Sequence, residues 1–407
     1  MMRSLIAKLP RDPAFLTGLA YLSFASVAVA VPGGYLGTDS ISARTAFVPV
    51  LSAIGLMIAS PLFHYSIPER MWLTARADDP RIVAVALALE AVGVMAVAVR
   101  FIIYGVPLFG QTDVSRLALV AGDPPVILAL GIVLLQVAPA LALAAALPCE
   151  GSQSRGSMRT AFVLGVVSAV LLLALGNRLR ILALLGYLAL VVAIRGVRVD
   201  GRWIALSAGA GGAFLGVYAL LRTVASKGSG WTMAYLERSG LGWIPAPLAW
   251  LGMLAISFRN PMVTSEILVA RFPAEQGHTW GWFTFGELLS LLPGKQELPE
   301  HFVTTQVLNG EVSRIGATAT PFPTGLYVDW GYLGVLAGSV AAGLAVMALW
   351  KAARESRDAG LAVATSVVIF SLVVGAYGSL PFSITNVWQV CVMLGVTMVS
   401  ARVRPRE

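Results

Sequence analysis

The chain has 407 residues, of which 57% are hydrophobic and only 12% are charged, and its mean hydropathy is +0.79. A water-soluble domain cannot bury so large an apolar fraction, so the composition predicts an all-α polytopic integral membrane protein. The formal net charge of +8 does not indicate nucleic-acid binding, because most of the basic residues lie in short segments on the predicted cytoplasmic side, the two termini included, where they set membrane topology.

The first 30 residues have features of a secretory signal peptide. Arg3, Lys8 and Arg11 precede an apolar run that ends in the small residues Ala28-Val29-Ala30. Nine further apolar segments follow, so we expect this segment to be retained as the first membrane helix.

Ten apolar segments meet or approach the length of about 20 residues that a membrane-spanning helix needs. With the N-terminus in the cytoplasm, every link that falls on the cytoplasmic side is basic, as the positive-inside rule requires. The sequence therefore predicts about ten transmembrane helices with both termini cytoplasmic. The ten segments are Ala14–Pro32, Thr45–Phe63, Ile82–Ile103, Val126–Leu147, Thr160–Leu175, Leu179–Ile194, Trp203–Leu221, Gly325–Trp350, Gly360–Tyr377 and Ile384–Ala401.

This pattern divides the chain into three consecutive regions. A seven-helix membrane region, 1–221, is followed by a long outer loop, 222–324, and by a three-helix membrane region, 325–407. The loop contains two apolar stretches, Leu241–Phe258 and Trp280–Leu292. Each is either interrupted by Pro or Gly or too short to cross the membrane comfortably. We therefore interpret both as interfacial or re-entrant helices. The alternative, that this pair crosses the membrane twice, preserves the topology and gives twelve spans.

Arginines on the predicted outer side run against the usual inside bias and indicate an anionic ligand. The turn Gly176-Asn177-Arg178-Leu179-Arg180 opens a helix, whose N-terminal N–H groups and two guanidinium groups suit a phosphate. The alternative is that both arginines extend to the membrane surface and end the helix. Of the further arginines on the same predicted side, four are candidate ligands, namely Arg116, Arg259, Arg271 and Arg314.

Three residues of the long loop are candidates for a general base, His278, Glu287 and His301. Asp329, at the outer start of the eighth predicted helix, pairs with an outer arginine or has a structural role at the helix end. The sequence contains no HExxH or CxxC motif, no phosphate-binding P-loop and no Rossmann fingerprint, so it predicts neither a metal nor a cofactor.

Three motifs carry a resemblance to the Wzy-type oligosaccharide repeat-unit polymerases, the O-antigen polymerase family. Each of them lies on the predicted outer side, and the long loop in the second half of the chain fits the same pattern. The motifs are Gly105-Val106-Pro107-Leu108-Phe109 with the downstream Arg116, the turn Gly176-Asn177-Arg178-Leu179-Arg180, and Gly325-Leu326-Tyr327-Val328-Asp329-Trp330-Gly331-x-x-Gly334.

The resemblance implies a fold like that of the GT-C-like polymerase and ligase superfamily, and a glycosyl transfer outside the bacterial cytoplasmic membrane. A sugar hydroxyl of one lipid-linked repeat unit attacks the anomeric carbon of a glycan on undecaprenyl diphosphate, and the lipid diphosphate leaves. Arginines can stabilise that leaving group without a metal. The implied partners are undecaprenyl-diphosphate-linked glycans, membrane lipid and a chain-length-regulating co-polymerase. The implied substrate-binding residues are Arg116, Arg178, Arg180, Arg259, Arg271, Arg314 and Asp329.

Two other functions stay open. O-antigen ligases of the same superfamily carry a His-Asn pair just before the helix that follows the long loop, and Thr318–Thr324 contains no histidine at that position. A lipid-linked glycan flippase or exporter requires charges along a central cavity, for which the sequence offers only Glu90 and Arg100.

We expect Arg178→Ala and Arg116→Ala each to remove the ladder of polymeric glycan while membrane insertion stays normal, because each change removes a donor to the leaving diphosphate and costs about 10²–10³ in rate. Replacement by Lys should restore little, since only the planar guanidinium binds two diphosphate oxygens at once. Gel analysis of the glycans measures this, and wild-type ladders from both alanine variants would remove the functional interpretation.

Overall fold

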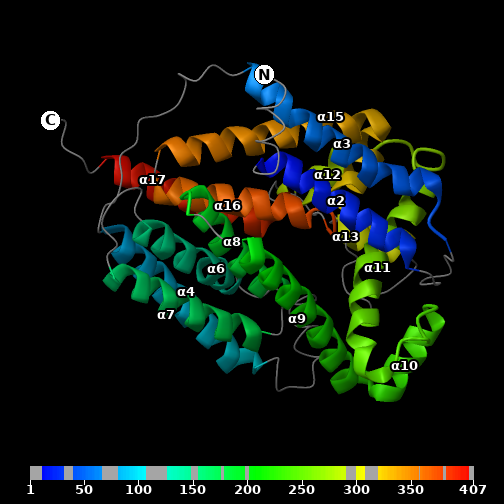
Figure 1. Cartoon of the computed structure of the whole chain (residues 1–407), viewed down its shortest axis with the longest axis horizontal. Coiled ribbons are helices and arrows are strands. Elements are labelled where there is room, and N and C mark those ends of the chain that lie inside the picture. Colours follow the sequence, from blue (N-terminus) through cyan, green and yellow to red (C-terminus); the bar gives the residue numbers. More distant parts are fainter. Residues whose placement is uncertain are drawn as a thin grey trace. The chain divides into compact units, whose positions relative to one another are not determined.

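The computed structural model of the chain is predominantly helical over the residues that it describes, and no strand occurs in those ranges (Figure 1). The described residues are 12–31, 40–66, 81–106, 126–147, 155–175, 178–197, 201–289, 299–307, 320–356, 358–378 and 382–402.

Each of the ten predicted apolar segments forms a helix. Five described helices are long and apolar enough to cross a membrane by length and composition, and the remaining predicted segments contain shorter apolar helices. The structure is thus compatible with a polytopic membrane protein, and the full count of ten crossings stays a prediction. The ten helices are α2 (Pro13–Ala30), α3 (Ala43–Ser66), α4 (Arg81–Tyr104), α6 (Val126–Ala146), α7 (Arg155–Ala174), α8 (Arg178–Ile194), α9 (Gly201–Lys227), α15 (Phe322–Ser356), α16 (Ala359–Val374) and α17 (Ile384–Arg402).

The long loop contains more helix than its apolar stretches predict. The predicted stretch 241–258 starts as a turn around Pro245, and the helix α11 begins only at Ala249 and continues past Pro261 to Arg271. The predicted stretch 280–292 is helical over Trp282–Leu289 in its described part. The loop elements are α10 (Ser229–Arg238), the 3₁₀ turn η2 (Ala246–Leu248), α11 (Ala249–Arg271), α12 (Trp282–Leu289), α13 (Pro299–Phe302) and the π-helical turn η3 (Val303–Val307).

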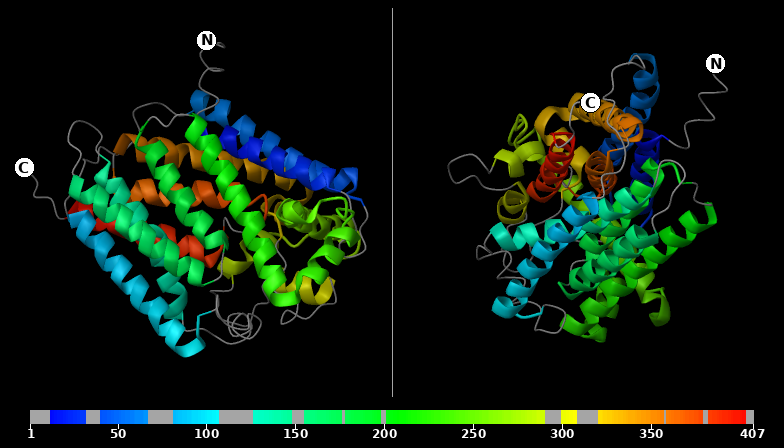
Figure 2. Two further views of the ribbon diagram at one scale, coloured as in Figure 1. Left: turned by 60° about the horizontal axis from the view of Figure 1, so that its bottom comes forward. Right: turned by 90° about the vertical axis from the view of Figure 1, so that its left-hand side faces the viewer.

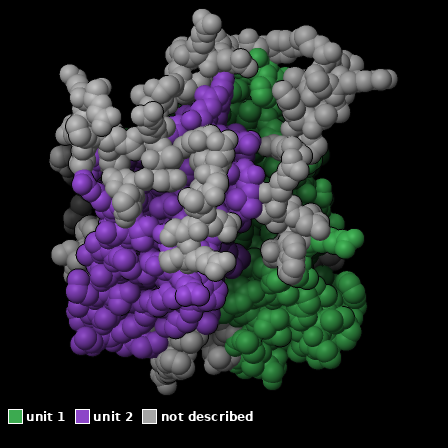
Figure 3. Space-filling model, turned by 60° about the vertical axis from the view of Figure 1, so that its left-hand side comes forward, with its two compact units in different colours: residues 1–65, 200–347, 372–383 green, residues 66–199, 348–371, 384–407 purple. Residues whose placement is uncertain are grey.

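Contacts divide the chain into two compact units (Figure 3). Both units are assembled from separated stretches of sequence, a different division from the three consecutive regions that hydropathy suggests. Unit 1 comprises 1–65, 200–347 and 372–383, and unit 2 comprises 66–199, 348–371 and 384–407.

In unit 1, α3 runs antiparallel to α2 and parallel to the part of α15 that belongs to this unit (Figure 2). The Tyr332 hydroxyl donates to the Arg44 carbonyl oxygen over 3.4 Å. Further along both helices, the hydroxyl groups of Ser52 and Ser339 lie 2.6 Å apart. Close approach requires small residues, since a Cβ added at Gly343 would lie 2.5 Å from a β-carbon of α3. These directions are the ones that alternating membrane crossings require.

In unit 2, α8 and α17 run parallel. Arg180 and Thr385, near the starts of the two helices, are joined by a 3.3 Å hydrogen bond from the guanidinium to the hydroxyl oxygen. Further along, the Tyr187 hydroxyl donates to Gln389 Oε1 over 2.9 Å. These helices correspond to the sixth and tenth predicted spans. Both spans are predicted to start on the outer side, which agrees with the parallel directions of α8 and α17.

Unit 2 also contains a close contact between α4 and α6. A Cβ added at Gly131 would lie 2.4 Å from the β-carbon of Ala96, and one added at Gly93 would lie 3.1 Å from the Gly131 carbonyl oxygen. Both helices are predominantly apolar, so burial of apolar area alone does not choose their contact face in a membrane. The glycines make this face the one on which the backbones can approach.

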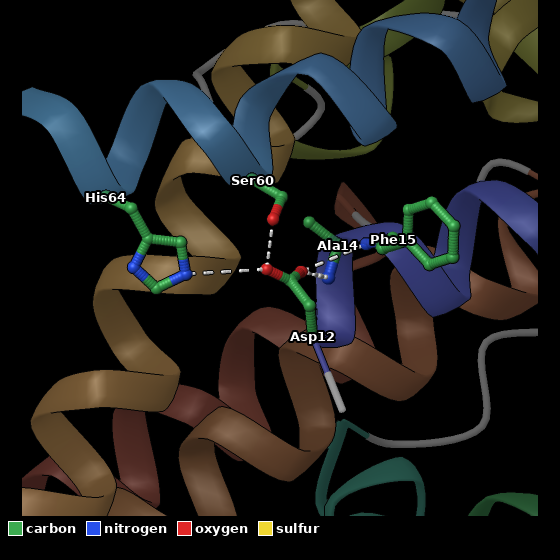
Figure 4. Close-up of polar contacts among 5 residues, drawn as sticks. All are labelled: Asp12, Ala14, Phe15, Ser60 and His64. Atoms are coloured by element: carbon green, nitrogen blue, oxygen red, sulfur yellow. Dashed lines mark hydrogen bonds and ion pairs between the residues drawn. The ribbon is translucent and has the colours of Figure 1, made fainter. Parts of the chain in front are cut away.

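The start of α2 is fixed by a buried carboxylate (Figure 4). Asp12 Oδ1 accepts hydrogen bonds from the backbone N–H groups of Ala14 and Phe15, at 2.9 and 3.0 Å. Its Oδ2 accepts from the Ser60 hydroxyl near the end of α3, and His64 Nε2 lies 4.0 Å away. One side chain therefore caps α2 and ties it to α3.

We expect Asp12→Ala to lower the free energy of unfolding by about 2 kcal/mol, because it removes the cap of α2 and the acceptor of Ser60 together. Thermal unfolding in detergent measures this, with Ser60→Ala as a control that leaves the cap in place and should cost less. Equal melting temperatures for wild type and Asp12→Ala would show that the cap contributes nothing.

Candidate functional site

Helix α15 is interrupted at Gly331, inside the motif that carries the third part of the family resemblance. Gly331 has φ 66° and ψ −162°, a region that only glycine adopts readily, so two helical segments meet there. A break of this kind interrupts the helical hydrogen-bond ladder and exposes backbone polar groups. The carbonyl oxygen of Val328 accepts from His278 Nδ1 at 3.1 Å and from the Thr279 N–H at 3.3 Å. The long loop therefore supplies hydrogen-bond donors to the break.

His278 has a defined tautomer in this arrangement. A carbonyl oxygen only accepts hydrogen bonds, so the Nδ1 that lies against Val328 carries the proton. In the neutral ring Nε2 is then the unprotonated nitrogen, and it faces Gly331, where an added Cβ would lie 3.5 Å from it. The side chain is half-buried. Nε2 is thus oriented as a proton acceptor.

Asp329 holds α12 against the same break. Its side chain is fully buried, and its two carboxylate oxygens accept from the backbone N–H groups of Phe283 and Thr284, at 3.0 and 2.8 Å. The Thr279 hydroxyl donates to it as well. A carboxylate at the first turn of a helix complements the helix dipole. Of the two roles expected for Asp329, these contacts fit the structural role at a helix end. The helix end is that of α12, and not that of α15, to which Asp329 belongs.

An apolar cluster supports these polar groups. Its members come from the end of α11, from α12, from the π-helical turn and from the start of α15, and Trp282 and Phe302 pack against it. The loop backbone that carries His278 therefore lies on a packed core. The cluster consists of Leu268, Phe272, Phe283, Val303 and Val328.

Arg259 lies against the end of α2. Its side chain is only 3% exposed, and its Nη1 donates to the carbonyl oxygens of Ala28, at 3.2 Å, and Val31. Both carbonyls lie at the C-terminal end of α2, where a cation is favoured by the helix dipole. These contacts give Arg259 a structural role at the end of α2.

The structure describes the side chains of only some of the other predicted arginines. Arg180 lies in unit 2, where it donates to Gln136 Oε1 at 3.4 Å and to Thr385, and Arg271 occupies the last turn of α11 in unit 1. Arg178 begins α8, but its side chain lies outside the described residues, as do Arg116 and Arg314 entirely. Their convergence on one site therefore stays a prediction.

Of the three candidate bases, His278 is the one whose hydrogen bond to the α15 break is described above. Glu287 is half-buried on α12, and His301 belongs to α13, although its side chain lies outside the described part. Sequence reasoning missed Thr279, whose N–H and hydroxyl both contact the α15 break. Its position beside His278 was the only signal that could have indicated it.

We expect Gly331→Ala to lower the free energy of unfolding by about 1–3 kcal/mol, because an L-residue is strained at this φ and ψ. The matched control is Gly165→Ala in α7, where φ is not positive and an added Cβ would meet open space. That change should be neutral or stabilising. Thermal unfolding in detergent compares them, and equal tolerance of both changes would contradict a structural need for glycine at the break.

Within the described ranges, no group of three or more His, Cys, Asp and Glu side chains is placed to hold a metal ion. No protein-family model matches the chain, and no curated protein or solved structure matches it. The functional argument therefore depends on the residues themselves.

Proposed function

We propose that this chain is a membrane glycosyltransferase that polymerises oligosaccharide repeat units carried on undecaprenyl diphosphate, on the outer side of the bacterial cytoplasmic membrane, with both of its termini in the cytoplasm. One observation carries the proposal. His278, on the long loop, has its Nδ1 bound to a backbone carbonyl at a break in a predicted membrane helix, which leaves Nε2 as the proton acceptor. Such a base is what a sugar hydroxyl needs in order to act as a nucleophile.

The transfer uses this geometry in a single displacement. The acceptor hydroxyl oxygen forms a bond to the anomeric carbon of the donor glycan and gives its proton to His278 Nε2. The bond from the anomeric carbon to the diphosphate oxygen breaks, and its electron pair leaves with the lipid diphosphate. The Nδ1–H bond to the Val328 carbonyl keeps the ring in one orientation and stabilises the imidazolium that forms.

The leaving diphosphate gathers negative charge as its bond breaks, so it needs cationic donors. We propose that five of the outer arginines supply them, Arg116, Arg178, Arg180, Arg271 and Arg314. Arg259 and Asp329 instead hold helices in place, Arg259 at the end of α2 and Asp329 at the start of α12. The motif resemblance and the basic turn at the start of α8 support a role in diphosphate binding for Arg116, Arg178 and Arg180.

We expect His278→Gln to reduce polymerisation about 10²–10⁴-fold, because glutamine cannot accept the proton. The assay uses purified protein in lipid vesicles with lipid-linked repeat units extracted from cells that lack this chain. His64→Gln is the matched control, since His64 is a partly exposed histidine near the end of α3, and its Nε2 lies 4.0 Å from Asp12. Polymerisation by His278→Gln at the wild-type rate would exclude His278 as the base.

Deletion of the gene separates the proposed function from the alternatives. A polymerase deletion leaves single repeat units on the final surface acceptor. Loss of every surface glycan would instead identify a flippase, and polymer that accumulates on the lipid carrier would identify a ligase. Either of these outcomes contradicts the proposal.

A further inference from the structure

Trp280 combines high exposure with an unfavourable backbone conformation. Its side chain is 78% exposed, and it is the one non-glycine residue in the described part of the chain whose φ is positive, at 53°. A bulky residue adopts this region only where its surroundings impose it, and such residues concentrate at functional sites. The indole is therefore held outward at a conformational cost.

The neighbouring residues impose this conformation. Gly277 and Gly281, on either side, also have positive φ, at 68° and 102°. Thr279 is fixed to the α15 break through its N–H and its hydroxyl, and its carbonyl accepts from the Trp282 N–H at 3.2 Å. The backbone on both sides of Trp280 is thus tied down, while Trp282 turns inward to pack on Phe283.

The exposed indole lies beside the proposed base. The ring centroids of Trp280 and His278 are 6.4 Å apart, and the ring planes are inclined by 72°. A molecule that lay on the indole face would therefore approach the histidine ring. Other tryptophans contact different side chains, since Trp231 stacks on Tyr235 and Trp330 lies against Phe285.

We propose that Trp280 is the platform on which the acceptor sugar binds, with the C–H face of a pyranose ring stacked on the indole and a hydroxyl directed toward His278 Nε2. This inference rests on the proposed function, since Trp280 would orient the acceptor sugar of the proposed transfer. A pyranose ring has an apolar face of axial C–H groups, which suits a large aromatic surface. Tryptophan provides that surface with few rotatable bonds, so little conformational entropy is lost on binding.

Exposed tryptophans also anchor proteins in the headgroup region of a membrane. Trp243, on the turn that precedes α11, allows a direct comparison, because it is 77% exposed in the same unit without a positive φ. A tryptophan of this unit thus reaches equal exposure without backbone strain. The strained backbone and the neighbouring histidine favour a sugar as the occupant of Trp280.

The test compares Trp280→Ala and Trp280→Phe with the matched control Trp243→Ala in the vesicle assay, with the concentration of acceptor varied. Stacking on an aromatic ring contributes enough that we expect Trp280→Ala to raise KM for the acceptor about tenfold and to change kcat little. Trp280→Phe should restore part of the affinity, and Trp243→Ala should match wild type. An unchanged KM in Trp280→Ala, with both alanine variants equally weakened in vesicle association, would identify a membrane anchor and overturn the proposal.

A binding measurement separates failure of this inference from failure of the proposed function. Mild acid releases the oligosaccharide from the extracted lipid-linked repeat unit, and calorimetry measures its binding without any turnover. About tenfold weaker binding to Trp280→Ala than to wild type and Trp243→Ala supports the platform even if no polymer forms. Equal binding by all three proteins, or no binding by wild type, overturns it even if polymerisation occurs.

Discussion

The candidate site depends on one constraint, which is that the carbonyl group of Val328 needs a hydrogen-bond donor. A backbone carbonyl that loses its helical partner in an apolar environment costs several kcal/mol unless another donor reaches it. The break at Gly331 creates this need, and the long loop meets it with the ring of His278 and the N–H of Thr279. The same two hydrogen bonds fix the loop on α15 and determine which imidazole nitrogen accepts a proton. A backbone requirement and a chemical one are thus satisfied by one contact.

Polar pairs and small residues perform a similar task elsewhere in each unit. Apolar helices in lipid gain little from burying apolar side chains against one another, so specific contacts must select the arrangement. In unit 2, Gln389 Nε2 donates to Gln136 Oε1 over 2.9 Å while its own Oε1 accepts from the hydroxyl of Tyr187. In unit 1, Ser265 and Thr324 are joined at 2.7 Å. Each of these bonds is buried, and sliding one helix along the other would break it, so they fix the register that hydrophobicity leaves open.

Hydropathy was sufficient to predict the ten apolar helices, because each is a predominantly apolar run bounded by charges, Gly or Pro. It was insufficient for the loop. Helix α11 continues past Phe258 because Arg259 finds carbonyl partners at the end of α2, and nothing local to Arg259 indicates them. His278 was a candidate base from its residue type, yet its tautomer follows from a carbonyl 50 positions away. The motif around Asp329 was visible in the sequence, but its physical reason, a buried cap on α12 next to a glycine-dependent break, requires coordinates.

The bond between Arg259 and the end of α2 has a consequence for how the protein is made. The carbonyls of Ala28 and Val31 receive their guanidinium donor from a residue that follows them by 231 and 228 positions. The residue that precedes α3 has the same dependence, since the N–H and the hydroxyl of Ser42 both donate to Glu266. At about 5–20 residues per second, a ribosome delivers α11 some tens of seconds after α2 has emerged. Until then these helix ends must rely on water or lipid headgroups, so the earliest membrane segments reach their final packing only late in synthesis.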